Sequence, residues 1–265
     1  MFPHVELSIN LVIILSLSAF GAGFVDSVGG GGGLIQVPAL LINFPKVSIP
    51  ILFGTNKIAA LLGTATSAYR YTKRVKIDWL FFLPVMAVAF IASYLGAKVV
   101  SYMDMEFLRV LVLVLLIVIA IYTYIKKDFG NGSNKNYGLK KRVALGSLIG
   151  LLVGFYDGFF GPGTGSFLMV GFVIVLGVEF IEASAYSKLI NCTSNIAALF
   201  VFLYQKDIII SVAIILAVFN ISGNLVGSHL ALKKGNGFIR LIFLGIIIVM
   251  IVKYTHSILG WGVML

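Results

Sequence analysis

Two lysines and two aspartates stand within apolar stretches of this 265-residue chain, where a charged side chain is costly. Asp26 and Lys57 lie in the first half, and Asp157 and Lys188 follow them by 131 positions each. A lysine within a membrane span costs ~2.5–3.5 kcal/mol on insertion scales, so it normally faces a partner or a wet cavity. One interpretation is a structural ion pair in each half, Lys57 with Asp26 and Lys188 with Asp157. The other, compatible with the first, is that the lysines attract an anion while the aspartates carry a coupling proton.

Each aspartate is followed by a glycine-rich segment, GFVDSVGGGGG at 23–33 and GFYDGFFGPGTG at 154–165. Glycine has no Cβ, so such a segment turns sharply and brings backbone amides close to a ligand. A short apolar run follows each loop, Leu34–Phe44 and Ser166–Val178, and the positive end of a helix there favours an anion. The alternative is that the glycines only permit tight helix packing. The candidate binding glycines are Gly29, Gly31, Gly33, Gly161, Gly163 and Gly165.

Small polar residues surround the second lysine. Asn191, Ser194 and Asn195 follow Lys188 closely, and the two asparagines are four positions apart, hence on one helix face. We expect this face to line a pore and its side chains to donate hydrogen bonds to an oxyanion. In the first half Ala60 and Thr64 occupy the equivalent positions. The two lysine regions are therefore not expected to be equivalent in function.

The elements that carry these residues are predicted to be membrane-spanning helices. The chain is 60% hydrophobic and only 11% charged, and its mean hydropathy is +1.06. A helix needs about 20 apolar residues to cross a bilayer. Eight runs approach that length, namely Leu7–Val25, Ile49–Tyr69, Trp79–Val100, Phe107–Ile125, Val143–Phe160, Ser184–Tyr204, Ile208–Leu232 and Phe238–Tyr254. The predicted fold is an all-α integral membrane protein with eight long spans and two short or re-entrant half-helices.

The recurring spacing of 131 residues indicates a tandem duplication. It also relates Gly96 to Gly227 and Arg109 to Arg240. We divide the chain into a first transmembrane repeat at 1–125, a basic linker at 126–142 and a second repeat at 143–265. Five segments in each repeat, an odd number, would invert the second repeat relative to the first, as in many secondary transporters.

The basic residues favour this five-segment topology. With both termini outside, the inner side carries thirteen lysines and arginines and the outer side five, as the positive-inside rule requires. Four segments per repeat would place the cluster at 70–76 and the linker on opposite sides. We therefore expect a multi-pass protein of the cytoplasmic membrane with a cytoplasmic linker. Whether the short segments span the membrane or are re-entrant stays open.

Other classes of function lack their residues. The net charge of +10 does not indicate nucleic-acid binding, because the basic residues lie in short connections between apolar runs. The single cysteine, Cys192, and three peripheral histidines leave no metal cluster, and no cofactor is expected. No nucleophile or acid–base cluster lies in the spans, so we expect no enzyme. No Gly-Lys-Ser/Thr follows the glycine loops, which excludes a P-loop.

The chain resembles the TauE/SafE family, also called sulfite exporters or toluene sulfonate uptake permeases. The segments GFVDSVGGGGGLIQVPALL, GFYDGFFGPGTGSFLMVGFVIVLG and SAYSKLINCTSNIAALFVF carry the resemblance, which covers nearly the whole chain. It implies transport of a small organosulfur or sulfur oxyanion, such as sulfite, a sulfonate or sulfoacetate, driven by an ion gradient. The alternatives are a passive anion channel and, less favoured, a membrane scaffold or an intramembrane enzyme. The expected partners are the anion and the lipid bilayer, and a homo-oligomer stays open.

Overall fold

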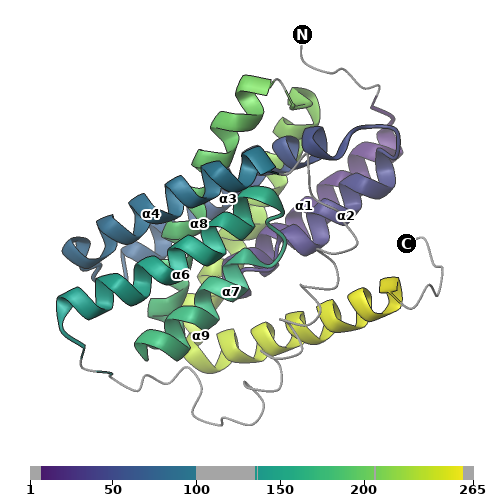
Figure 1. Ribbon diagram of the computed structural model, residues 1–265. Coiled ribbons are helices and arrows are strands. Elements are labelled where there is room, and N and C mark those ends of the chain that lie inside the picture. Colours follow the sequence, from purple (N-terminus) through teal and green to yellow (C-terminus); the bar gives the residue numbers. More distant parts are fainter. Residues whose placement is uncertain (1–6, 100–134, 136, 206, 259–265) are drawn as a thin grey trace.

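The computed structural model describes residues 7–99, 135, 137–205 and 207–258, and every regular element within them is a helix. The order is α1 (Ile9–Gly29), α2 (Gly33–Asn43), α3 (Ile49–Thr72), α4 (Trp79–Val99), α6 (Leu139–Phe159), α7 (Thr164–Gly171), a π-helical turn (Phe172–Leu176), α8 (Phe180–Gln205) and α9 (Ile210–Ile258). Figure 1 shows the long helices packed lengthwise into one bundle, with α9 turning at its kink, Gly235. The all-α class is confirmed.

Fewer helices qualify as membrane spans than we predicted. Within the described ranges, five are long and apolar enough to cross a membrane: α1, α4, α6, α8 and the first part of α9, Ile210–Gly235. The prediction of eight is thus corrected. The 24-residue α3 is long enough, but it buries polar side chains such as Asn56, Lys57 and Thr64, which lower its apolarity. The predicted run Phe107–Ile125 lies outside the described residues, as does Arg109.

The distribution of side chains is that of a membrane protein. Large apolar residues such as Leu17, Leu80 and Leu152 face outward, whereas Lys188 and Asn224 are buried inside the bundle. In water the hydrophobic effect would disfavour the outward residues, but in a bilayer they contact lipid tails. The chain is therefore a multi-pass membrane protein.

Each glycine loop ends a long helix and begins a short one, as predicted. The helix α1 ends at Gly30, which adopts a left-handed conformation (φ 77°), and α2 is only 11 residues long. In the second half, Gly161 (φ 88°) and Gly163 (φ 86°) turn the chain between α6 and the eight-residue α7. Only glycine adopts these φ values without a steric penalty.

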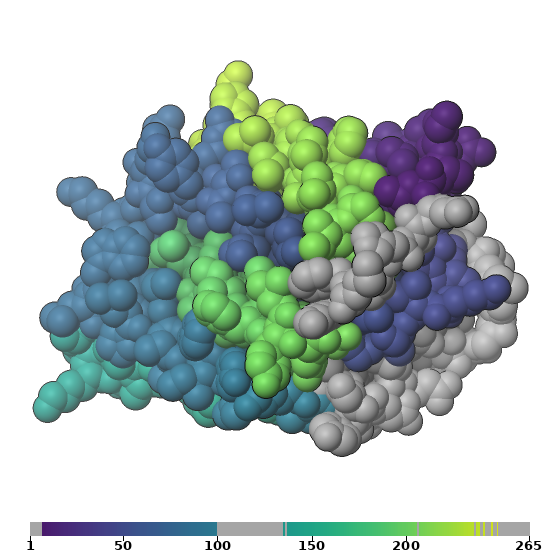
Figure 2. Space-filling view, turned by 90° about the horizontal axis from the view of Figure 1, so that it is seen from above, coloured from purple at the N-terminus to yellow at the C-terminus, as the bar shows by residue number. Residues whose placement is uncertain are grey.

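The two halves of the chain interlock. The helix α1 packs along α9, and α6 packs along α4, so each first helix has its main partner in the other half (Figure 1). The equivalent glycines mediate both contacts: Gly96 lies against the backbone of Phe155 and Gly227 against that of Phe24. In Figure 2, α3 and α4 (blue) lie directly against α8 and the start of α9 (green). Small residues allow this close approach of helices in membranes.

The basic segments gather at one end of the bundle. Arg142 at the start of α6 forms an ion pair of 3.0 Å with Asp78, which precedes α4. The end of α3 and the α9 segment before the kink line one cleft, with Arg70 and Lys233 on its walls. The inner-side positions compared by the charge count, where described, therefore lie together in space.

The contact between the loops predicts a sharp sensitivity at Gly30. A Cβ at this position would lie 2.6 Å from the backbone nitrogen of Ser166, and the left-handed conformation alone would cost an alanine about 1–2 kcal/mol. We expect Gly30→Ala to lower the thermal unfolding midpoint of the purified protein. Gly21→Ala is the matched control, because nothing lies within 4 Å of its added Cβ. Equal midpoints for the two variants would contradict the tight contact.

Candidate functional site

The two glycine loops meet at the centre of the bundle. The Ser166 backbone amide donates to the Gly30 carbonyl (3.1 Å), and the Ser166 hydroxyl donates to the Gly29 carbonyl (2.6 Å). A Cβ on Gly165 would lie 2.7 Å from the Gly30 oxygen, so the two backbones touch without side chains between them. The Ser187 hydroxyl of α8 donates to the Gly165 carbonyl (2.8 Å) and holds this crossing from below. Loops from residues 135 positions apart thus form one element.

The ion pairs connect the halves rather than closing within them. Lys57 donates to the Asp157 carboxylate (2.9 Å) and to the Asp157 carbonyl (2.7 Å). Lys188 forms an ion pair with the Asp26 carboxylate (3.2 Å) and donates to the Asp26 carbonyl. Our pairing of Lys57 with Asp26 and of Lys188 with Asp157 was therefore wrong. Since α3 and α8 each cross to the first helix of the other half, each lysine reaches the opposite aspartate.

The two pairs differ in their surroundings. The Asp157 carboxylate also accepts hydrogen bonds from Thr164 (2.9 Å) and Ser194, and its side chain is only 3% exposed. The Asp26 carboxylate accepts one further bond, from Thr64 (3.0 Å), and its side chain is 11% exposed. Asp26 is thus the less enclosed of the two carboxylates.

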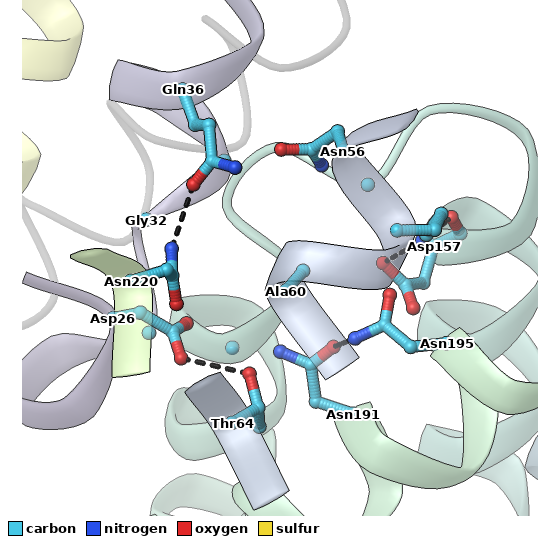
Figure 3. A pocket seen from close by; sticks show the side chains of 15 residues that line it. Asp26, Gly32, Gln36, Asn56, Ala60, Thr64, Asp157, Asn191, Asn195 and Asn220 are labelled. Carbon is cyan, nitrogen blue, oxygen red and sulfur yellow. Dashed lines mark hydrogen bonds and ion pairs between the residues drawn. The ribbon is translucent and has the colours of Figure 1, made fainter. Parts of the chain in front are cut away.

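A small polar cavity of about 30 Å³ lies beside both pairs (Figure 3). A volume of this size holds roughly two water molecules. Its lining consists of Asp26, Gly30, Gly32, Gly33, Gln36, Asn56, Lys57, Ala60, Thr64, Asp157, Gly161, Gly165, Asn191, Asn195 and Asn220. Backbone of both loops, both carboxylates and five side-chain amides thus converge on one point.

The structure brings together most of the residues singled out from the sequence. Those lining the cavity are Asp26, Gly33, Lys57, Asp157, Gly161, Gly165, Asn191 and Asn195. The face that carries Asn191 and Asn195 does meet the cavity, and the two amides are joined by a 2.8 Å hydrogen bond. Gly29, Gly31, Gly163, Lys188 and Ser194 support the site from outside its lining. Lys188 and Ser194 act through the carboxylates that they contact.

Two residues of the lining were missed. Gln36 accepts a hydrogen bond from Asn220 (2.7 Å), and Asn224 donates to the side-chain oxygen of Asn220 (2.8 Å). Asn220 and Asn224 repeat the four-residue spacing of Asn191 and Asn195, a signal that could have identified them. A glutamine directly after a glycine loop in an apolar run was a second one.

Two side-chain atoms at the cavity have no hydrogen-bond partner among the described residues. These are Nε2 of Gln36, which is 1% exposed, and Oδ1 of Asn56, which is 9% exposed. A buried polar atom without a partner costs free energy, so native proteins rarely keep one without a ligand or water to satisfy it. The site is therefore chemically suited to a small polar occupant.

The positive charge is already balanced. Both ammonium groups are bonded to carboxylates and the lining contains no further cation, so the cavity's formal charges cancel. Attraction of an anion by free lysines is not what this conformation offers. The donors available to an oxyanion are amide groups of side chains and of the loops, together with the positive end of α2. Among the described residues no group of histidines, cysteines and carboxylates could hold a metal ion.

Comparison with known proteins agrees with this arrangement. The family model for "Sulfite exporter TauE/SafE" matches residues 15–254, which include both loops and both ion pairs. The chain belongs to the TauE/SafE family. A probable membrane transporter protein of Sinorhizobium, ORF9, is 34% identical over 262 residues, covering 97% of this chain and 98% of that protein.

Further relatives are similar along their whole length. YfcA of Escherichia coli K12, also named a probable membrane transporter protein, is 33% identical over 249 residues, with 93% and 90% of the two chains covered. A probable membrane transporter protein of Haemophilus influenzae is 29% identical over 256 residues. No solved structure matches the chain significantly. As a TauE/SafE protein the chain is a membrane transporter, and this family membership argues against an enzyme.

The crossed pairing can be tested by removing charges two at a time. Lys57→Met with Asp157→Asn deletes one complete pair, whereas Lys57→Met with Asp26→Asn leaves Asp157 and Lys188 without partners. Removing one partner of a buried pair costs about 3–5 kcal/mol. The first double variant should therefore retain a folded monodisperse peak and the second should lose it. The opposite ranking in size-exclusion chromatography would restore the pairing within each half.

Proposed function

We propose that this TauE/SafE protein is a secondary transporter for a small sulfur-containing anion of the sulfite, sulfonate or sulfoacetate type. It moves the anion across the cytoplasmic membrane by alternating access, coupled to an ion gradient. The observation that carries the proposal is the meeting of two broken-helix loops at a polar cavity between the two halves. Secondary transporters place their substrate sites at such breaks, near the membrane midplane. The sulfur chemistry rests on the family's name and on the resemblance of the glycine-loop segments.

The architecture we propose is a pair of inverted repeats at 1–125 and 143–265. Its support is the spacing of 131 residues, which relates both ion pairs and the glycine contacts of Gly96 and Gly227. The linker 126–142 lies in the cytoplasm and both termini lie outside. The gathering of basic segments at one end of the bundle supports this orientation through the positive-inside rule.

The substrate is bound by amides rather than by a bare cation. Its oxygens accept hydrogen bonds from Gln36, Asn191 and the glycine backbone, while Lys57 keeps Asp157 neutralised at the rim. A sulfonate is larger than two water molecules, so this conformation is the closed one of the cycle. Separation of the two loops, which touch through glycines alone, opens the cavity to either side.

Asn191→Ala tests the binding role. A lost hydrogen bond to a charged group costs about 1.5–3 kcal/mol, so half-saturation of uptake should require roughly 10–100 times more anion. Sulfite and sulfoacetate are the radiolabelled probes, measured in proteoliposomes. The control is Thr193→Val on the same helix, because the Thr193 hydroxyl bonds to the Leu189 carbonyl and lies outside the lining.

Several outcomes would overturn this assignment. Unchanged uptake by Asn191→Ala would remove the amide from the site, and an equal loss in Thr193→Val would point to general damage of α8. Large unitary currents carried by the anion, without saturation or stimulation by anion on the far side, would favour the passive channel. Wild-type transport of neither probe would exclude the substrate class.

Coupling is proposed to reside at Asp26, the less enclosed carboxylate. It lines the cavity, contacts Lys188 and accepts only one further side-chain hydrogen bond, from Thr64. In Asp26→Asn we expect exchange of anion across the membrane to persist while net uptake no longer responds to an imposed pH gradient. Asparagine keeps an acceptor for Thr64 but takes up no proton, and Lys188 keeps its bond to the backbone carbonyl. An intact response to the pH gradient would refute proton coupling at this residue.

A further inference from the structure

A second cavity lies at the end of the bundle, far in sequence from the glycine loops. It measures about 410 Å³ and is formed where α3 ends beside the part of α9 that precedes the Gly235 kink. Its lining shares no residue with the central cavity. Its polar walls consist of Tyr69, Arg70, Lys73, Arg74, His229 and Lys233. We call it the basic cleft.

The charge of the basic cleft has one sign. Four of its side chains are permanently cationic, and no aspartate or glutamate lines it. The nearby acidic residue Asp78 is bonded to Arg142 instead. Like charges held together repel one another, so a cluster of this kind is stabilised by an anion that neutralises it.

One arginine in the cleft is fixed in place. The Arg70 guanidinium donates to the Leu225 carbonyl and lies 3.4 Å from the Ser228 hydroxyl, so α3 and α9 hold it between them. Three of its donors remain beyond these two bonds, because a guanidinium carries five N–H groups. A planar fork of this kind matches the oxygens of a phosphate group. The exposed Lys73 and Arg74 surround the anchored Arg70 with movable charges.

The border of the cleft is apolar and faces outward. Leu62, Leu225 and Val226 are exposed on the same two helices, one to two turns from the basic side chains. Tyr69 is 62% exposed and lies under the Lys73 ammonium at 4.2 Å from the ring centre. Aromatic and basic residues in this order mark the boundary between the apolar core and the headgroups of a bilayer. A ligand with a charged head and apolar tails fits this combination.

We propose that the basic cleft binds the phosphate group of an anionic phospholipid, with the acyl chains lying along α3 and α9. Basic pockets between transmembrane helices on the cytoplasmic side bind such headgroups. Free phosphate offers the same oxygens but no contact with the apolar border. The lipid bridges α3, which carries Lys57, and α9, which carries Asn220, and it thereby stabilises the bundle. The site does not depend on which anion the protein transports.

The test compares lipids with the purified full-length protein in a neutral detergent. Phosphatidylglycerol, phosphatidylcholine and inorganic phosphate are added separately, and bound lipid is counted by native mass spectrometry alongside the thermal midpoint. We expect phosphatidylglycerol to bind and raise the midpoint, and phosphatidylcholine to do neither. Lys73→Gln, Arg74→Gln and Lys233→Gln together should weaken phosphatidylglycerol binding by about 100-fold, since each basic residue near a membrane surface contributes comparably.

A second triple variant controls for surface charge in general. Lys76→Gln, Lys140→Gln and Lys141→Gln remove the same charge at the same end of the bundle but outside the cleft. This variant should bind phosphatidylglycerol nearly as the wild type does. Equal weakening by the two triples, or no weakening by either, would overturn the proposal. A midpoint shift with inorganic phosphate equal to that with the lipid would assign the site to free phosphate and overturn the lipid assignment.

Discussion

The fold depends on burying two lysines and two aspartates in an apolar bundle. A buried charge is tolerated only when it is paired and hydrogen-bonded, because the interior does not solvate it as water does. Lys57 finds Asp157 and Lys188 finds Asp26, each in the other half of the chain. Neither half can therefore neutralise its own charges. The interlocking of α1 with α9 and of α6 with α4 follows from the same requirement, since it brings the opposite aspartate to each lysine.

The crossed pairs also determine where the polar centre lies. Each aspartate sits in the last turns of a long helix, directly before a glycine loop, so pairing the charges pulls both loops to one point. Side chains there would prevent the contact, and Gly30 and Gly165 have none. The result is a cavity lined by amides, carboxylates and bare backbone within a bundle whose outer surface is apolar. A transporter needs such a centre, because a polar solute must exchange its hydration for protein groups.

Much of this arrangement could be predicted from the sequence, and the failures have physical causes. The loops, the short helices after them and the asparagine face follow from local rules of helix termination and periodicity. The pairing does not, because a spacing of 131 residues shows that Lys57 and Lys188 are equivalent without showing which aspartate either contacts. Pairing within halves and pairing across them satisfy the same symmetry. Gln36 and Asn220 escaped notice because an isolated amide in an apolar run usually indicates a helix–helix contact. The number of spans was overestimated because α3 buries its polar face inside the bundle.

The most direct measurement is an experimental density map of the purified protein in a lipid nanodisc with sulfite or sulfoacetate bound. The account predicts that Lys57 contacts Asp157, that Lys188 contacts Asp26, and that the anion lies between the glycine loops within hydrogen-bond distance of Asn191. A map in which each lysine pairs within its own half, or in which the anion lies away from both loops, would contradict it.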